Sequence, residues 1–313
     1  MADVFFRASY DALENITTAF DFVHPLNVSL RYTRDKVAKA KKDNPKIKDA
    51  DLKNIIDPNN LVHGVNYTKA FIETLWDTQE ELLSWLLLNN LFAIHEGWAQ
   101  RMYDDVFSSG KYDERTFLKN LEYENLYGKL SSYFVKKNDM SNALESAFFQ
   151  VYKAKSGLDF SKLDNYMLCY RFFKEARNCY MHHNFVASPN LISAYQKFLP
   201  VATTKDLDVS EVPAYVAPIL GQRVQLQLRG VIGFSQLIRR IIIISDICLL
   251  RAKAAEKEFI DRIPFNWNCW TLSGDNATAK GQVNRYATKV GFLKSQWSNE
   301  YQDFLIKHGI LHK

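Results

Sequence analysis

The sequence predicts a mostly α-helical protein, and three observations lead to this expectation. The 313 residues include only 12 glycines and 8 prolines, too few for the many turns of a β-sandwich. Apolar residues make up 47% of the chain and recur at three- and four-residue spacing over long stretches, as in helices that bury one face. A single short alternation of apolar and polar residues, near 223–229, predicts one short strand or an extended connector.

The N-terminal part combines an amphipathic helix with a basic segment. Residues 3–22 have the period of a helix, and we expect Pro25 to end it. Residues 31–53 contain nine basic and four acidic side chains, which is a local charge of +5. Because the whole chain also has a net charge of +5, the other residues are together formally neutral. We interpret 31–53 as an exposed basic arm or helical hairpin, which either contacts an RNA backbone or is only a solvated surface.

Helical periods continue through the rest of the chain, separated by loops at glycines and prolines. The helices are expected at 68–107, 113–137, 140–154, 163–185, 231–261 and 275–307. Pro189 is expected to close the fourth of these, and 200–222 is expected to be a loop. We therefore divide the chain into three parts: an N-terminal helix with the basic arm (1–60), a helical core (61–263) and a C-terminal helical extension (264–313).

Several classes of protein are excluded by missing motifs. The sequence contains no phosphate-binding loop, dinucleotide-binding fingerprint, zinc-protease helix or nucleophile elbow. The four cysteines form no CxxC pair, and free thiols fit a reducing compartment. The first residues lack the pattern of a signal peptide, and no apolar run is long enough to span a membrane. We expect a cytoplasmic protein that has no cofactor and no metal and that does not contact a membrane.

One polar cluster, EARNCYMHHN at 175–184, ends a helix that is otherwise apolar. Arg177 is always charged and can hold a phosphate through two hydrogen bonds. An imidazole can both accept and donate a proton, so His182 can act in proton transfer. RNA supplies its own nucleophile, the 2′-hydroxyl group, so its cleavage needs only proton transfer and stabilisation of the anionic phosphorus. In a chain of this composition the pattern Arg-Asn-x-x-x-His is expected about 0.02 times by chance.

The cluster resembles the Arg-x(4–6)-His signature of the HEPN family (higher eukaryotes and prokaryotes nucleotide-binding). Four residues separate Arg177 from His182, and five separate it from His183. The resemblance implies a helical bundle of HEPN type with terminal helical additions. It also implies a homodimer in which two motifs form one composite, metal-independent endoribonuclease site. Members of the family act in toxin–antitoxin, abortive-infection and antiviral defence systems, so a regulatory or antitoxin partner is expected as well as the RNA substrate.

The predicted site has two catalytic residues and four supporting ones. They are Arg177 and His182 (catalytic) and Asn178, His183, Asn184 and Glu96 (supporting). On an ideal helix His182 lies about 140° round from Arg177 but only about 40° from Asn178. Arg177 must therefore reach round the helix or act toward a partner subunit, while Asn178 can orient His182 or contact phosphate. Some family members have a tyrosine where Asn184 stands, so any role of that tyrosine is not carried over.

Each assignment has a structural alternative. Arg177 and His182 also suit a charged helix end that complements the helix macrodipole. His95 and Glu96, in the middle of a long apolar helix, also suit a hydrogen-bonded pair in the core. For the whole protein the alternative is a non-catalytic helical module that binds RNA or another protein, and a further hypothesis is a toxin that stays silent until a partner activates it.

Overall fold

A computed structural model describes residues 4–107, 140–263, 270–271 and 276–312. The described part contains eleven α-helices, which confirms the prediction of a mostly α-helical protein. The helices of the first half are α1 (Arg7–Asp43), α2 (Asp49–Ile56), α3 (Trp76–Phe107), α6 (Asn142–Leu144), α7 (Gln150–Ser156) and α8 (Leu163–His182). Those of the second half are α9 (Pro189–Phe198), α10 (Leu228–Leu249), α11 (Ala254–Arg262), α12 (Asn276–Lys289) and α13 (Asn299–Lys307).

Short elements complete the described structure. Two are π-helical turns, η1 (Lys69–Glu73) and η2 (Glu145–Phe149), and two are 3₁₀ turns, η3 (Phe160–Lys162) and η4 (Leu199–Val201). The two strands, β1 (Trp270–Thr271) and β2 (Leu311–His312), pair in parallel. None of the described helices combines the length and the apolarity that a membrane crossing requires.

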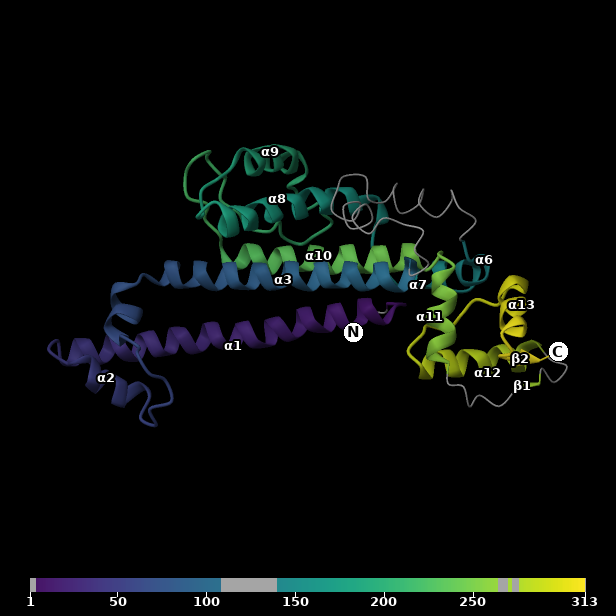
Figure 1. Cartoon of the computed structure of the whole chain (residues 1–313), viewed down its shortest axis with the longest axis horizontal. Helices are drawn as coiled ribbons and strands as arrows, with labels where there is room; N and C mark the ends of the chain where they lie inside the picture. Colours follow the sequence, from purple (N-terminus) through teal and green to yellow (C-terminus); the bar gives the residue numbers. More distant parts are fainter. Residues whose placement is uncertain (1–3, 108–139, 264–269, 272–275, 313) are drawn as a thin grey trace.

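The long helices lie in layers (Figure 1). α1 runs antiparallel to α3, with an ion pair near each end: Arg101 to Asp11 at 2.8 Å and Arg31 to Glu80 at 3.5 Å. α10 packs against α3, and α8 with α9 covers the side of this pair that faces away from α1. α11, α12 and α13 gather at the end where α3 stops.

Stacked aromatic rings hold α3, α8 and α10 together. The rings of Phe173 on α8 and Phe234 on α10 stack with centroids 4.5 Å apart, and Phe92 on α3 meets Tyr170 on α8 at 5.2 Å. All four side chains belong to one buried cluster that extends from Val4 to Leu311. Because the three helices share this core, the position of the end of α8 relative to α3 is well defined.

The prediction that Pro25 ends the first helix was wrong. α1 continues through Pro25 and is 37 residues long in total. Proline removes one backbone hydrogen bond and crowds the preceding turn, but Pro25 is exposed, so water can reach the carbonyl that loses its partner. Buried Val23 and the half-buried Leu26 pack into the core on either side of it. Tertiary packing on the far face of α1 thus outweighs the local preference to break.

Other predicted helices differ at their ends. Predicted helix 68–107 is divided at Thr74, which is extended and accepts a 2.8 Å hydrogen bond from Arg34. Predicted helix 231–261 is divided into α10 and α11 at Arg251, whose carbonyl accepts from Ser141 at 2.8 Å. In both places a long-range hydrogen bond replaces a helical one, and local periodicity does not reveal it. The predicted helix at 113–137 lies outside the described residues.

The segment after α8 also differs from the prediction. Pro189 does not close α8 but begins α9, where Ser188 caps the helix by accepting from the backbone of Leu191 at 3.3 Å. The residues before α10 are extended, and Arg223 forms an isolated antiparallel bridge with Val186. The predicted connector near 223–229 is therefore present up to the start of α10, without a regular strand.

Residues 31–73 form what we call the N-terminal lobe. Its small core consists of Val37, Leu52, Tyr67 and Phe71 and is separate from the main cluster. The end of α1 and α2 form the helical hairpin that was one of the two predictions for the basic arm. The division of the chain at 60 and 263 stays a prediction.

Candidate functional site

α8 carries the predicted motif to one end of the layer formed by α8 and α9. The side chains that α8 turns inward, from Tyr166 to Cys179, are buried in the main core. Arg177 and Asn178 are half-buried, and His182 is the exposed last residue of the helix. The motif residues therefore differ in burial along less than two helical turns, from a packed arginine to a solvated histidine.

Arg177 lies against α3. Its Nε donates a hydrogen bond to Oδ1 of Asn89 at 3.3 Å, and its guanidinium carbon lies 6.0 Å from the centre of the Phe92 ring. No other partner of Arg177 is found among the described residues. The two terminal amino groups of the guanidinium, which are the ones that hold phosphate in a forked pair, are therefore left available.

Asn178 is held by a different set of side chains from the one expected. Its amide donates to Oε2 of Glu175 at 3.4 Å, and Glu175, which is 3% exposed, forms a 2.5 Å ion pair with Arg171. No hydrogen bond between Asn178 and His182 is seen in the described part of the chain. Asn178 is thus oriented by a buried carboxylate one turn earlier, with its carbonyl oxygen still free to accept.

The last three predicted residues are solvent-exposed. His182, His183 and Asn184 project at the end of α8, where Asn184 and Phe185 have positive φ angles of 48° and 66° and reverse the chain. Within the described residues of one chain, Arg177 and His182 form no contact with each other. This agrees with their expected separation around the helix.

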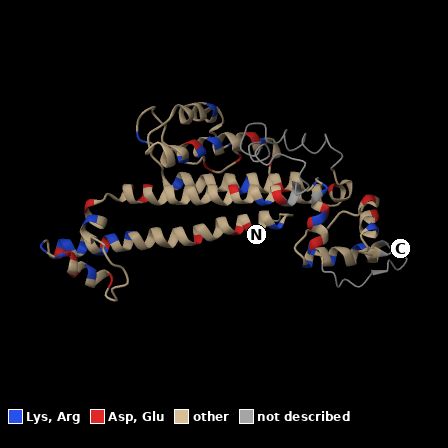
Figure 2. Cartoon of the chain, viewed as in Figure 1, with Lys and Arg blue, Asp and Glu red and all other residues tan. Residues whose placement is uncertain are grey.

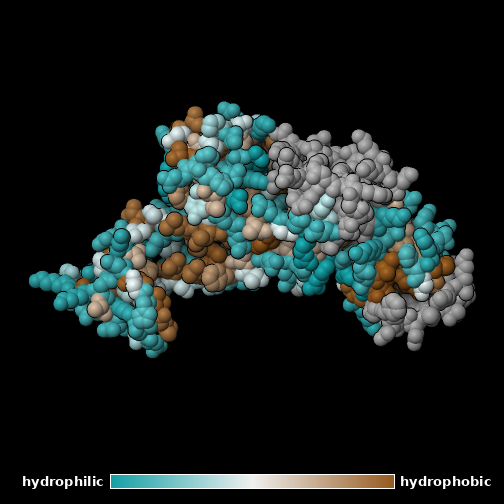
Figure 3. All heavy atoms as spheres, in the orientation of Figure 1, coloured by the Kyte–Doolittle hydropathy of each residue, from teal (hydrophilic) through white to brown (hydrophobic). Residues whose placement is uncertain are grey.

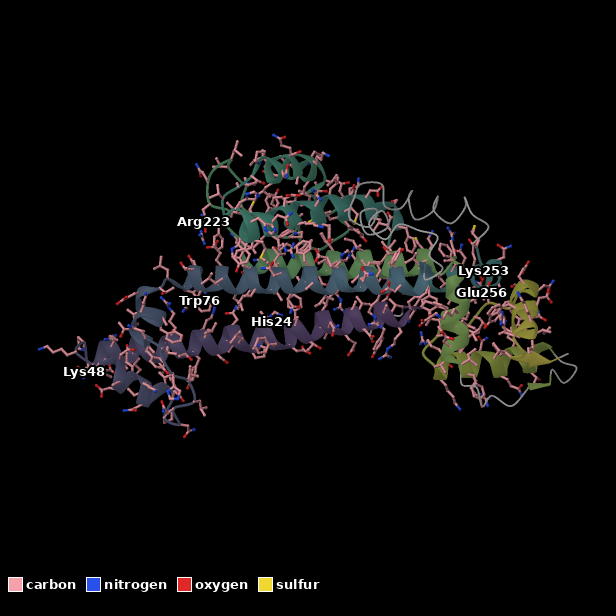
Figure 4. All side chains as sticks on the ribbon, in the orientation of Figure 1. His24, Lys48, Trp76, Arg223, Lys253 and Glu256 are labelled. Carbon is pink, nitrogen blue, oxygen red and sulfur yellow. The ribbon has the colours of Figure 1, made fainter. Side chains whose placement is uncertain are left out.

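An aromatic cluster fixes the end of α8 on α3. Trp85 stacks on Tyr180 with centroids 5.1 Å apart and planes inclined by 7°, and Phe185 meets both rings edge-on. Arg223, labelled in Figure 4, lies over the Phe185 ring at 4.2 Å and reaches Glu81 at 3.6 Å. No local sequence pattern predicts this cluster. Tyr180 lies within the motif and Phe185 follows it, but nothing local shows that Trp85, 95 to 100 positions earlier, meets them.

Beside this cluster, α3 leaves one apolar face uncovered. We call four residues the α3 stripe: Leu75, which directly precedes α3, and Leu82, Leu86 and Ala93 on α3. They recur at intervals of seven, four and seven residues and are all exposed, Leu86 by 63%. Figure 3 shows hydrophobic surface over this half of α3. Asn89 lies between Leu86 and Ala93, so the hydrogen bond to Asn89 places Arg177 at the border of the stripe.

A groove near the end of α8 does not include the motif. It has a volume of about 660 Å³ and lies between the first turns of α3 and the connector into α10. Asp77, Glu80 and Glu81 line one side, and Arg223 and Arg229 line the other. Because acidic side chains outnumber basic ones there, the groove is a poor match for an RNA backbone.

Glu96 and His95 lie further along α3. His95 is buried, its Nδ1 lies 3.2 Å from the Tyr170 hydroxyl, and its Nε2 has no partner among the described residues. Burial, with a smaller contribution from Lys174, lowers the pKa of His95 to about 3, so this imidazole is neutral. His95 is thus a core residue whose partner is Tyr170 and not Glu96. Glu96 is half-buried two turns beyond Asn89 and touches no motif residue among the described contacts.

The described residues contain no group of three or more His, Cys, Asp or Glu side chains that could hold a metal ion. Comparison of the chain with protein-family models, with curated proteins and with solved structures found no match.

Proposed function

We propose that this protein is a metal-independent endoribonuclease of the HEPN type. The observation that carries the proposal is the Arg-Asn-x-x-x-His cluster on the last turns of α8, where His182 is exposed and Arg177 keeps its terminal amino groups available. An imidazole in water can transfer a proton, and a guanidinium fixed on a helix can stabilise the anionic phosphorus; RNA cleavage by the 2′-hydroxyl uses both actions.

The reaction consists of one displacement at phosphorus. The 2′-oxygen attacks the phosphorus and loses its proton to a base, while the 5′-oxygen leaves and receives a proton from an acid. The products carry a 2′,3′-cyclic phosphate and a 5′-hydroxyl group. In this proposal His182 transfers a proton, and Arg177 stabilises the crowded anionic phosphorus of the transition state. Asn178, held by Glu175, can accept a hydrogen bond from a ribose hydroxyl.

We propose further that two copies of the chain share the site. One chain supplies a single His182, whereas the reaction needs both a base and an acid, and Arg177 and His182 do not meet within one chain. The α3 stripe supports this arrangement, because it is an uncovered apolar face that borders Arg177. Burying Leu82 and Leu86 against a second copy would bring the two α8 ends toward each other.

The test is cleavage of RNA by the purified full chain in the presence of EDTA, with the chemical ends of the products identified. General acid–base groups contribute about 100- to 10,000-fold, so His182→Ala is expected to lose at least about 100-fold in rate. His24→Ala is the matched control, because His24 is an exposed histidine on α1, far from α8 (Figure 4). Cleavage that survives in His182→Ala, or that stops in EDTA, contradicts the proposal.

The proposed setting is a cytoplasmic toxin or antiviral defence system with a regulatory or antitoxin partner. It predicts that cells overproducing the chain stop growing, and that His182→Ala removes the growth defect at equal protein levels. A chain that is toxic in cells but inactive when pure would indicate the silent form that a partner activates.

A second candidate is a non-catalytic helical module that binds RNA or protein. It is favoured by the side-chain bonds inside the motif, since Asn89 already engages Arg177 and Glu175 already engages Asn178, as in a purely structural helix end. This candidate predicts RNA or protein binding that is unchanged in Arg177→Ala and His182→Ala, without any cleavage by the wild-type chain.

A further inference from the structure

We propose that the N-terminal lobe is a binding surface for single-stranded nucleic acid, separate from the motif on α8. Tyr32 stacks on a base there, and Lys36 and Lys39 contact phosphates. The proposal goes beyond the cleavage reaction and does not depend on Arg177 or His182.

The lobe is a folded unit with its own core, so its surface has a definite shape. Val37 on α1, Leu52 on α2 and Phe71 in η1 are buried against one another. Asp49 joins the two sides of the lobe by accepting from the backbone N–H groups of Tyr67 at 2.8 Å and Thr68 at 2.9 Å. The charges on the lobe are therefore displayed on a rigid support.

The charges of the lobe are unbalanced at its surface. Residues 31–73 contain ten basic and six acidic side chains. Asp49, Asp51 and Asp57 each accept backbone N–H groups of the lobe itself, which uses part of their hydrogen-bonding capacity internally. The basic side chains that are exposed and have no side-chain partner among the described residues are Lys39, Lys42, Lys46, Lys48 and Lys69. Figure 2 shows Lys and Arg gathered at this end of the molecule, and Figure 4 labels Lys48 there.

An exposed aromatic ring lies among these charges. Tyr32 is 61% exposed, and the Lys36 ammonium lies 4.6 Å from the centre of its ring. At about 100° per residue, Lys39 points within about 20° of Tyr32, and both point about 140° to 160° away from buried Val37. An exposed ring with lysines on the same helix face is the arrangement that binds single strands, because a base can stack on the open side of the ring while cations hold the backbone.

This surface lies apart from the motif. Tyr32 and Lys39 point away from Val37, which packs in the separate core of the lobe. The lobe lies at one end of the molecule, beyond the start of α3, whereas α8 packs along α3 (Figure 1). A strand bound on the lobe therefore contributes to affinity for nucleic acid and leaves the chemical step of the same chain unchanged.

The experiment is binding of a fluorescent single-stranded 20-mer RNA to the full chain in EDTA, measured by anisotropy at several salt concentrations. All proteins carry His182→Ala so that no cleavage interferes. Each phosphate contact adds about 0.7 to the salt slope for single strands, so Lys36→Gln with Lys39→Gln is expected to lower the slope by about 1.4. Tyr32→Ala is expected to weaken binding by about 5- to 150-fold through loss of stacking.

The matched control is Lys280→Gln with Lys307→Gln, which removes two exposed lysines from α12 and α13 and is expected to leave the slope unchanged. An unchanged slope in the lobe variant overturns the proposal, and so does a Tyr32→Ala variant that binds single strands as wild type does. Binding of phosphatidylserine vesicles that depends on Lys36 and Lys39, without RNA binding, overturns it as well.

The two proposals fail in distinguishable ways. If RNA binding depends on Lys36 and Lys39 but the wild-type chain, with His182 intact, does not cleave RNA, only the proposed ribonuclease activity is contradicted. If the chain cleaves RNA but its affinity for RNA is the same in the lobe variants as in wild type, only the proposed binding surface on the lobe is contradicted.

Discussion

The end of α8 and the N-terminal lobe carry similar polar side chains in opposite settings. On α8, Arg177 is half-buried on Phe92 and bonded to Asn89. In the lobe, Lys39 is exposed and has no partner among the described residues. A fixed cation can act at one defined point of a transition state, whereas mobile cations on a rigid support attract a polyanion without choosing a point. The comparison indicates that the burial and the partners of a basic residue, together with its residue type, bear on what it can do.

The largest difference between the two regions is expected when an aromatic side chain in each is replaced by alanine and the free energy of unfolding is measured. Trp85 is fully buried and stacks on Tyr180, so Trp85→Ala is expected to lower the free energy of unfolding by about 3–5 kcal/mol. Tyr32 is exposed, so Tyr32→Ala is expected to change it by less than about 0.5 kcal/mol. Urea denaturation of both variants measures the difference. Equal losses would show that Tyr32 is a packing residue and would remove the contrast between the regions.

The next effect concerns the fixed cation. Arg177→Lys keeps the charge but not the planar fork, so it is expected to lose nearly as much cleavage activity as Arg177→Ala, about 100-fold or more. The measurement is the cleavage rate at saturating RNA, with the melting temperature as a check on folding. In the lobe the corresponding exchange, Lys39→Arg, should leave RNA affinity nearly unchanged, because only charge matters there. Full activity of Arg177→Lys would show that Arg177, like the lysines of the lobe, acts through its charge alone.

Changing the pH is expected to have a smaller net effect on the free energy of unfolding. Two buried titratable groups, His95 and Asp246, change this free energy in opposite directions. His95 connects α3 to Tyr170 on α8, and Asp246 on α10 accepts from the N–H groups of Phe5 at 2.7 Å and Phe6 at 3.0 Å, just before α1. Burial lowers the pKa of His95 from 6.5 to about 3 and raises the pKa of Asp246 from 3.8 to about 7.

The signs follow from which state binds more protons. The unfolded chain binds more protons at His95 between about pH 3 and 6.5, so stability from His95 is full above 6.5 and is lost as pH falls. The folded chain binds more protons at Asp246 between about pH 4 and 7, so stability from Asp246 is lost as pH rises through that range. The two contributions therefore offset each other between about pH 4 and 6.5.

Single variants should separate the two contributions. In Asp246→Asn, stability is expected to rise with pH from about 4 to 6.5, because only the His95 contribution remains. In His95→Gln it is expected to fall as pH rises from about 4 to 7. Urea unfolding across this pH range measures both slopes, and slopes of the same sign in the two variants would contradict the assignment.

The smallest effect on stability is expected from a substitution in the α3 stripe. The same substitution is expected to change the oligomeric state. Leu86 is exposed, so Leu86→Asp is expected to change the free energy of unfolding by less than about 0.5 kcal/mol. If two copies meet across the stripe, the same variant shifts the molecular mass in solution from dimer to monomer and lowers cleavage in parallel. Val28→Asp on the exposed side of α1 is the control and should leave the mass unchanged. A Leu86→Asp variant that stays dimeric would separate the stripe from the proposed composite site.

Some features were predictable because they depend only on neighbours in the chain. The helical class, the hairpin around 31–53 and the extended connector before α10 follow from periodicity, charge and alternation. The angle between Arg177 and His182 follows from helix geometry alone, and the structure keeps them apart as expected. The ends of the helices were less predictable, since the breaks at Thr74 and Arg251 are made by hydrogen bonds from Arg34 and Ser141 far away in the sequence.

The sequence by itself determined which residues carry charge and chemistry: the cluster at 175–184 and the local excess of +5 at 31–53. Only the tertiary structure decided their settings. It placed Asn89 under Arg177, Glu175 beside Asn178 and Trp85 under Tyr180, and it left Lys36 and Lys39 exposed on the N-terminal lobe. The physical reason is that the period of a helix specifies which residues share a face, whereas the partner that covers each face comes from distant segments through packing of the core.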